Sequence, residues 1–445
     1  MRTVGIIAEY NPFHTGHEYH LKKAKELTDA DYAVVVMSPD FVQRGEPAIF
    51  DKYTRTEMAL RSGADLVIEL PVCYAAGSAE YFAEGAVRML DALGVVDALC
   101  FGAEPDRDAL SGQTTIFTTE KEQCSLLQMA ASLLLEEPEE FRESLQEGLR
   151  SGLPFPQARH QALREYCIRR SLAAPAALDS ILSSPNSILG IEYCKALQKI
   201  NSSISPVLLT RRGSQYSDRS LKGEYCSASA IRHAIRTAPK PLNADALRKA
   251  LSSYIPAGCA DLFAAALTAP VFADDLLPVL VQKLIYTEVA HSSPPVRFDE
   301  ILDISPDLSE RIRNLRFSCI GKSFDETVTL LKTRQVAETH IRRALLHLIL
   351  DIRKADILSY QENGSLFYAH LLGFRHEAAP LLHEIKKRSA LPLLSKAAHA
   401  SRLLSDAGLH MWNQDAAASH LYRSIKTAKH GIPFRTEYEI SPIVF

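Results

Sequence analysis

Near its amino terminus the chain reads Val4-Gly-Ile-Ile-Ala-Glu-Tyr-Asn-Pro-Phe-His-Thr-Gly-His17. The apolar run over residues 3–9 is typical of a buried parallel strand, and residues 17–27 have the periodicity of a helix. Two histidines flank Gly16 at the junction between them. A helix start attracts anions, and imidazoles can donate hydrogen bonds to phosphoryl oxygens. Histidines can also merely cap a helix, but the strand before them and the helix after them favour a phosphate site.

Strand-like and helical segments alternate through the first half of the chain. We expect strands at residues 3–9, 32–38, 65–71, 96–102 and 205–211, and helices at 17–27, 51–62 and 78–93. This alternation predicts an α/β fold with a doubly wound parallel sheet. Ligands of such sheets bind at the carboxyl ends of the strands.

The pattern changes twice along the chain. Residues 120–200 are mainly helical and form an expected insertion before the last strand. A proline-rich stretch over residues 237–243 precedes a leucine-rich, helical half that ends in an extended tail. We therefore expect a catalytic domain over residues 1–238 and a mainly α-helical domain over residues 239–445.

The composition is that of a folded soluble protein. Of the 445 residues, 47% are hydrophobic and 23% are charged, and the net charge of −3 gives no general attraction to nucleic acid. The eight cysteines form no CxxC pair, so reduced, buried thiols are expected. The chain begins directly with a strand and has no apolar run of membrane-spanning length, which predicts a cytoplasmic protein without a membrane partner.

Polar residues follow the second strand, where the same pocket would lie. Asp40 could hold a magnesium ion or orient a nucleophile, and Arg44 could pair with phosphate or RNA. The alternative for both is a polar surface turn.

Residues at later strand ends extend the expected site. Gly102 could let an adenine ring approach the backbone, and Asn186 is either a helix cap or a reader of ribose or base. After the last strand, a triphosphate clamp or ordinary helix caps are expected from Arg211, Arg212, Ser227 and Ser229. The sequence contains neither a Walker lysine loop nor a Gly-x-Ser-x-Gly elbow, so phosphate chemistry remains the main interpretation.

Several longer stretches of the sequence resemble those of known families. The loop over residues 11–17 resembles the His-x-Gly-His motif of the nucleotidyltransferase superfamily. The chain as a whole resembles the bacterial tRNA(Met) cytidine acetate ligases, through residues 5–14, 41–48, 65–71 and 186–190, and through 332–334 and 342–347 in its second half. The resemblance covers essentially the whole length and implies a Rossmann-like nucleotidyltransferase fold.

The resemblance implies a two-step reaction with ATP as co-substrate and Mg²⁺ as a cofactor. Acetate attacks the α-phosphate to give acetyl-adenylate, and the acetyl group then passes to N4 of the wobble cytidine of elongator tRNA(Met). His14 and His17 would stabilise charge on the α-phosphate, with Asp40 as a further catalytic candidate. The implied ATP site comprises Ile7, Ala8, Glu9, Tyr10, Asn11, Pro12, Phe13, His14, Thr15, Gly16, His17, Glu18, Tyr19 and His20, with Gly102, Asn186 and Arg211.

A tRNA-binding surface is expected on basic side chains of both halves. The candidates are Arg44, Lys52, Arg55, Lys332, Arg334, Arg342 and Arg343. The alternative for each is a solvated surface charge. The basic motif near residue 332 is thinned, because Gln335-Val-Ala-Glu338 stands where the family pattern has further polar or basic residues.

Two other functions compete with the ligase. A small-molecule adenylyltransferase would use the same ATP chemistry, but it needs little more than the sheet domain. A non-catalytic RNA-binding protein would have lost its nucleotide site, whereas both motif histidines are present.

Overall fold

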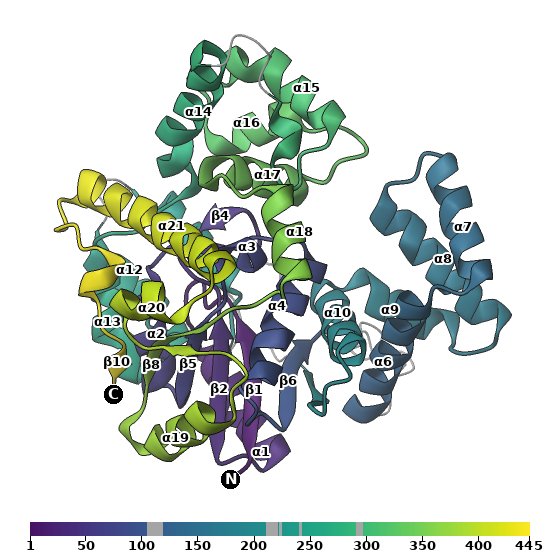
Figure 1. The fold of residues 1–445 in the computed structure, drawn as a ribbon, viewed down its shortest axis with the longest axis horizontal. Coiled ribbons are helices and arrows are strands. Elements are labelled where there is room, and N and C mark those ends of the chain that lie inside the picture. Colours follow the sequence, from purple (N-terminus) through teal and green to yellow (C-terminus); the bar gives the residue numbers. More distant parts are fainter. Residues whose placement is uncertain (105–118, 211–220, 222–224, 240–242, 291–296) are drawn as a thin grey trace.

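The computed structural model describes residues 1–104, 119–210, 221, 225–239, 243–290 and 297–445. A central sheet runs in the order β10-β8-β5-β2-β1-β6-β7, with β9 paired to β8 (Figure 1). Its strands are β1 (Thr3–Ala8), β2 (Tyr32–Met37), β5 (Leu66–Glu69), β6 (Ala98–Ala103), β7 (Ser205–Thr210), β8 (Ala369–Phe374), β9 (Leu393–Leu394) and β10 (Ile443–Val444). A two-stranded hairpin pairs β3 (Phe41–Val42) with β4 (Glu46–Pro47).

The expected doubly wound α/β sheet is confirmed. Strands β1, β2, β5, β6 and β7 are mutually parallel. The structure adds β8, which pairs antiparallel with β5, and β10, which runs parallel to β8. Since β8, β9 and β10 come from the half expected to be mainly helical, that half completes the sheet. The division at residue 238 stays a prediction.

Helices cover both faces of the sheet because successive apolar side chains of its buried strands point to opposite faces. In β2, Val34 and Val36 enter one core, whereas Val35 and Met37 enter the other. The first core contains side chains of α4 (Ala79–Ala92), α6 (Glu120–Glu136), α10 (Pro185–Lys199), α19 (Ala379–Arg388) and α21 (Asp406–His430). The second contains side chains of α1 (Thr15–Thr28), α2 (Lys52–Arg61), α11 (Ala228–Thr237), α12 (Ala244–Leu251) and α13 (Ala260–Ala266).

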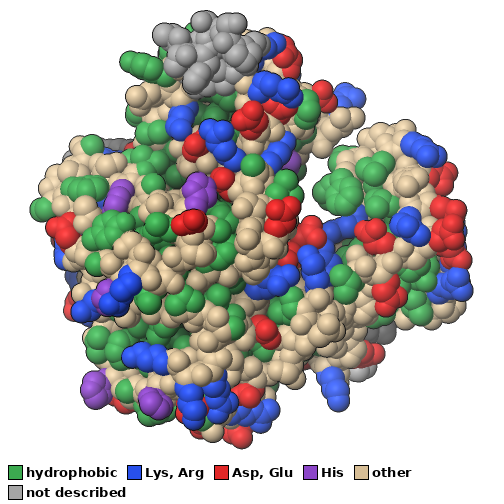
Figure 2. Space-filling model, viewed as in Figure 1, with side chains coloured by type: hydrophobic (Ala, Val, Ile, Leu, Met, Phe, Trp, Pro, Cys, Tyr) green, Lys and Arg blue, Asp and Glu red, His purple; other side chains and the backbone are tan. Residues whose placement is uncertain are grey.

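Two helical lobes stand out from this core (Figure 1). One contains α7 (Glu139–Arg150), α8 (Phe155–Arg169) and α9 (Pro175–Ser183), and the other contains α14 (Leu277–Ala290), α15 (Pro306–Leu315), α16 (Phe324–Leu331) and α17 (Glu338–Leu350). Helix α18 (Lys354–Glu362) leads from the second lobe back to the core, where it bonds to α21. The described residues also form the short helices α3 (Val72–Ala75) and α20 (Ala400–Leu403). The surface is hollowed between the lobes, and basic and acidic side chains are interspersed on this face (Figure 2).

Two expectations from composition can be compared with the structure. All eight cysteines are free and buried, as expected for reduced thiols. Within the described ranges, every helix is too short or too polar to span a bilayer.

Candidate active site

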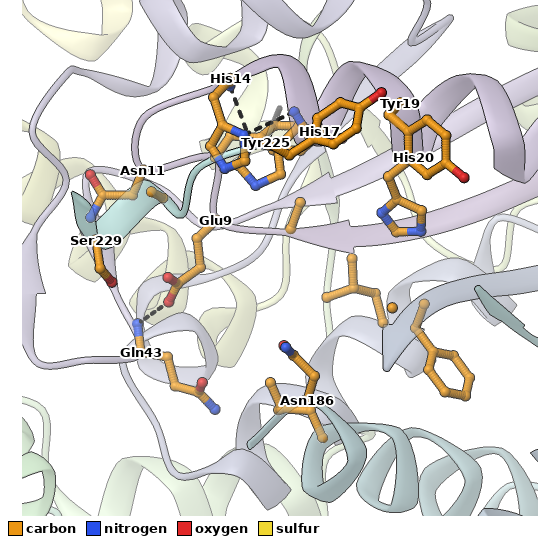
Figure 3. A pocket seen from close by; sticks show the side chains of 18 of the residues that line it. Glu9, Asn11, His14, His17, Tyr19, His20, Gln43, Asn186, Tyr225 and Ser229 are labelled. Carbon is orange, nitrogen blue, oxygen red and sulfur yellow. Dashed lines mark hydrogen bonds between the residues drawn. The ribbon is translucent and has the colours of Figure 1, made fainter. Parts of the chain in front are cut away.

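A pocket opens at the carboxyl ends of β1, β6 and β7, beside the amino ends of α1, α10 and α11 (Figure 3). This is the edge at which doubly wound sheets bind ligands. The predicted nucleotide contacts that line it are Ile7, Ala8, Glu9, Tyr10, Asn11, His14, Gly16, His17, Tyr19, His20, Gly102, Asn186 and Ser229. The other lining residues are Gln43, Arg44, Phe82, Phe101, Leu189, Tyr193, Leu209, Tyr225, Cys226, Ala228 and Arg232.

His14 and His17 cap α1 and also form part of the pocket wall. The N–H of Gly16 donates to Nδ1 of His14 at 3.0 Å, and the N–H of His14 donates to Nδ1 of His17 at 3.3 Å. The two ring centroids lie 3.8 Å apart. Because each Nδ1 accepts a backbone N–H, the neutral rings carry their protons on Nε2. Both rings are therefore set up as hydrogen-bond donors at the start of a helix.

Buried contacts fix the loop that precedes α1. Phe13 is fully buried, and Tyr10 has a left-handed φ of 49°. The Oδ1 atom of Asn11 accepts the N–H of Ile49 at 2.8 Å, and the Asn11 carbonyl accepts Nη1 of Arg232 at 2.6 Å. Within the stretch 7–20, the residues that do not line the pocket are Pro12, Phe13, Thr15 and Glu18.

One side of the pocket is apolar and suits a purine ring. The ring centroids of Phe101 and Tyr193 lie 5.7 Å apart, and Gly102 lies next to Phe101 in β6. Asn186, in the first turn of α10, donates from Nδ2 to a carboxylate oxygen of Glu104 at 2.6 Å. An apolar, aromatic wall beside a fixed amide offers ring contacts and one oriented polar contact.

Charged side chains gather beside the histidine loop. Arg44 and Arg232 line the pocket, and Nε of Arg232 lies 3.4 Å from a carboxylate oxygen of Glu46. Glu9 also lines the pocket, and its Oε1 accepts the N–H of Gln43 at 2.9 Å. Burial raises the pKa of the Glu9 carboxyl, although the charges of Arg44 and Arg232 oppose the shift.

Several predicted residues lie elsewhere. Asp40 is 1% exposed and outside the pocket lining, and its Oδ1 accepts the N–H of Lys52 at 2.7 Å. Burial raises the pKa of this carboxyl. Ser227 caps α11 by accepting the N–H of Ala230 at 3.0 Å. Arg211 and Arg212 lie outside the described residues.

Burial of Lys52 and Arg55 corrects their expected place on an RNA surface. Nζ of Lys52 lies 2.7 Å from carboxylate oxygens of both Glu69 and Glu437. Nη1 of Arg55 donates to the carbonyl oxygens of Glu9 and Ser38. A buried charge requires such partners, and a side chain without solvent contact cannot meet RNA.

The other expected RNA contacts differ in exposure. Lys332 and Arg334 follow α16 and are exposed. Arg342 and Arg343, on α17, are each ion-paired with an aspartate, and their side chains are 14% and 13% exposed. Arg44 lines the pocket.

Some lining residues that were not predicted could have been found from the sequence. Gln43 belongs to the polar loop after the second strand, and Arg232 falls one helical turn after Ser229. The apolar wall had no such signal, because Phe82, Leu189 and Tyr193 resemble any core residue of a helix. Their role depends on how α4 and α10 pack against the sheet.

Comparisons with known proteins agree along most of the chain. The model of the HIGH Nucleotidyl Transferase family matches residues 1–112 and 107–433. The chain is 38% identical over 450 residues to the tRNA(Met) cytidine acetate ligase of Clostridium perfringens, with 100% of both chains covered. It is 39% identical over 425 residues to the protein of that name from Thermoanaerobacter sp., with 95% of both covered.

Solved structures show the same fold. Thermotoga maritima TmcAL bound with alpha-thio ATP matches with a TM-score of 0.85 at 28% identity. The apo form of that protein matches with a TM-score of 0.86 at 29% identity. Both matches cover 100% of each chain.

Proposed function

The chain belongs to the tRNA(Met) cytidine acetate ligase family, and on this premise we propose how its pocket works. ATP binds with its adenine against the apolar wall and its phosphates at the start of α1. Acetate is activated there, and the acetyl group passes to N4 of the wobble cytidine of elongator tRNA(Met). The observation that carries this proposal is the pair of Nδ1-anchored histidines facing the pocket from a helix start.

In the first step an acetate oxygen attacks the α-phosphorus of ATP. The bond to the bridging oxygen breaks, and pyrophosphate leaves with the electron pair. Negative charge on the α-phosphoryl oxygens grows in the transition state, where the Nε2–H groups of His14 and His17 can donate to it. Arg44 and Arg232 lie in the same pocket and can hold the remaining phosphates or the acetate carboxylate.

In the second step the activated acetyl group meets the tRNA. The exposed Lys332 and Arg334, with Arg342 and Arg343 on α17, are the proposed contacts with its backbone. ATP, acetate and tRNA meet in the cytoplasm, which is where this reaction takes place.

The pocket itself does not build a magnesium site. Glu9 is the one carboxylate among the described lining residues, and the groups around it are imidazoles and guanidiniums. Carboxylates, water and phosphate oxygens are what Mg²⁺ prefers. We therefore expect Mg²⁺ only as a counter-ion on the ATP phosphates.

The proposal is tested by measuring the two steps separately. Exchange of labelled pyrophosphate into ATP should depend on acetate and should not require tRNA. N4-acetylcytidine should appear, by nucleoside mass spectrometry, only when ATP, acetate and elongator tRNA(Met) are all present. A matched tRNA with uridine at the wobble position should stay unmodified. Exchange that requires a phosphorylated metabolite instead of acetate would replace the ligase with a small-molecule adenylyltransferase.

A further inference from the structure

Glu9 places a carboxylate in a pocket that must bind anions. ATP and acetate, the substrates of the first step, are both negative, so a carboxylate repels them. Among the described residues that line the pocket, Glu9 is the one acid. Its charge opposes the binding of acetate and of the ATP phosphates, whereas the neutral cytosine amine of the second step can donate a hydrogen bond to it.

The Glu9 carboxylate is held by the backbone and points into the pocket (Figure 3). Its Oε1 accepts the N–H of Gln43 at 2.9 Å, whereas its Oε2 accepts no hydrogen bond from another described residue. The charges that act on Glu9 come from Arg44, Arg232 and Glu46. Oε1 is thus fixed by the backbone, and Oε2 is placed to accept a hydrogen bond from a substrate.

The loop that anchors Glu9 also contacts the helix expected to meet tRNA. Gly45 lies two residues after Gln43, and a Cβ at Gly45 would be 2.4 Å from backbone atoms of Arg342 and Arg343 in α17. A tRNA bound along α17 would therefore deliver its wobble base past this loop, toward Glu9.

Cytosine offers amino hydrogens on N4, and a carboxylate is the side chain that accepts from them. This amine is a weak nucleophile because its lone pair is delocalised into the ring, so removal of a proton during attack assists the transfer. We propose that Glu9 is the general base of the acetyl transfer, its Oε2 first accepting the N4 hydrogen bond and then taking the proton. This inference rests on the proposed function.

The step balances with the groups that the proposed function supplies. A bond forms between N4 and the carbonyl carbon of acetyl-adenylate. The bond from that carbon to the phosphate oxygen breaks, and the electron pair leaves with AMP. The proton from N4 ends on Glu9. By contrast, adenylate formation moves no proton, because acetate enters and pyrophosphate leaves as anions.

The test is Glu9→Gln, which keeps an oxygen acceptor for the Gln43 N–H but cannot take a proton. In single-turnover transfer from preformed acetyl-adenylate to tRNA(Met), we expect E9Q to fall about a hundredfold or more. Pyrophosphate exchange should stay at the wild-type rate or rise, because the first step needs no base and E9Q removes a charge that repels ATP and acetate. Glu377→Gln is the control, since it makes the same change at a carboxylate that is 72% exposed, lies 3.6 Å from Arg375 and is outside the pocket lining. E377Q should transfer at a rate near that of the wild type.

A pH profile separates a base from a merely structural carboxylate. Wild-type transfer should rise with pH until Glu9 is ionised, and E9Q should lack that rise. His14 and His17 face the same pocket and remain in E9Q, so the difference between the two profiles reports Glu9.

Four outcomes would contradict the inference. Transfer by E9Q at the wild-type rate, or an E9Q profile with the same rise, would overturn it and leave the proposed function intact. Loss of exchange in E9Q as large as its loss of transfer would assign Glu9 to the first step instead. Absence of acetate-dependent exchange in the wild type would overturn the proposed function and this inference with it.

Discussion

His14 and His17 each use Nδ1 to cap the helix, and both rings line the pocket. Nδ1 of both rings accepts a backbone N–H at the start of α1, which is the work that a serine or glutamate does in an ordinary capping box. That bond fixes the ring orientation and leaves the proton on Nε2. The sequence leaves capping and phosphate binding as alternatives. In the structure the same two rings cap α1 and line the pocket, so one role does not exclude the other.

The two roles can be separated by substitution. Ser is a good N-cap and Glu is a good third residue of a capping box, so His14→Ser and His17→Glu should keep α1 while removing the imidazole N–H donor. We expect each variant to melt near the wild-type temperature and to lose about a hundredfold in acetate-dependent pyrophosphate exchange. His14→Ala is the control, because it should also lose about 1 kcal/mol of stability with the cap. Wild-type exchange rates in H14S and H17E would exclude the phosphate role.

The difference between these histidines and Lys52 shows how far single residues could be predicted. The motif at His14 and His17 is local, so strand, loop and helix could be identified within one short stretch. Lys52 is also conspicuous as a basic residue, but its partners Glu69 and Glu437 are 17 and 385 residues away. Nothing near Lys52 in the sequence shows that both carboxylates converge on it, so its burial could not be foreseen.

The elements of the first half were predictable because their signals are local. The expected strands at 32–38 and 205–211 are observed as β2 and β7, with ends shifted by one residue, and α4 has one residue fewer at each end than predicted. Strand β8 was missed, because its short apolar run Ala369–Phe374 lies in a leucine-rich region where strand and helix look alike. Its identity as a strand depends on pairing with the distant β5.

The hairpin of β3 and β4 connects the pocket with α17. It carries Gln43, whose N–H holds Glu9, and Arg44, which lines the pocket. Gly45 has a φ of +75° and lies against the backbone of Arg342 and Arg343. Only glycine tolerates this positive φ and leaves room for so close a backbone contact. The hairpin therefore fixes the distance between the pocket and α17.

Gly45→Ala tests this connection, and Gly63→Ala supplies a matched control. Gly63 also has a positive φ, of +107°, but a Cβ there would have nothing within 4 Å. Both variants should lose about 1 kcal/mol from backbone strain. G45A must also push the hairpin off α17, so we expect an extra loss of about 1–3 kcal/mol in urea unfolding and a slower acetyl transfer. Equal effects of the two substitutions would show that the contact with α17 is unimportant.

Across the whole molecule, a buried ionic cluster joins the two halves of the sequence. Nζ of Lys52 in α2 binds Glu69 at the end of β5 and Glu437 near the end of the described chain. Glu437 also accepts Nη2 of Arg423 from α21 at 2.5 Å, and His370 of β8 binds Glu69. Removing one member leaves the others as unpaired buried charges, which is strongly destabilising.

Glu437→Gln should therefore destabilise the protein in a pH-dependent way. Lys52 and Arg423 hold the pKa of Glu437 well below its ordinary value of 4.5. A lowered pKa adds stability that is present above about pH 4.5 and is lost as the pH falls through the native pKa. We expect E437Q to lose about 3–5 kcal/mol of unfolding free energy at pH 7, with the difference from wild type shrinking below pH 4.5.

The exposed Glu377 gives the control for this prediction. Its carboxylate lies 3.6 Å from Arg375 and is 72% exposed, so Glu377→Gln should leave the urea midpoint unchanged at both pH values. The measurement is urea unfolding of the three proteins at pH 7 and near pH 3, which lies inside the window where the stabilisation is lost. A constant difference between wild type and E437Q across that range would mean that the cluster is not held by charge.

The pairing of β5 with β8 can form only after most of the chain has been synthesised. Glu69 and His370, which face each other across these strands, are 301 residues apart in the chain. A ribosome adding 5–20 residues per second needs about 15–60 s to synthesise that interval. During this time the edge of β5 has no native partner and is open to pairing with other chains. Production of this protein should therefore benefit from low temperature or chaperones, which protect the nascent sheet until β8 emerges.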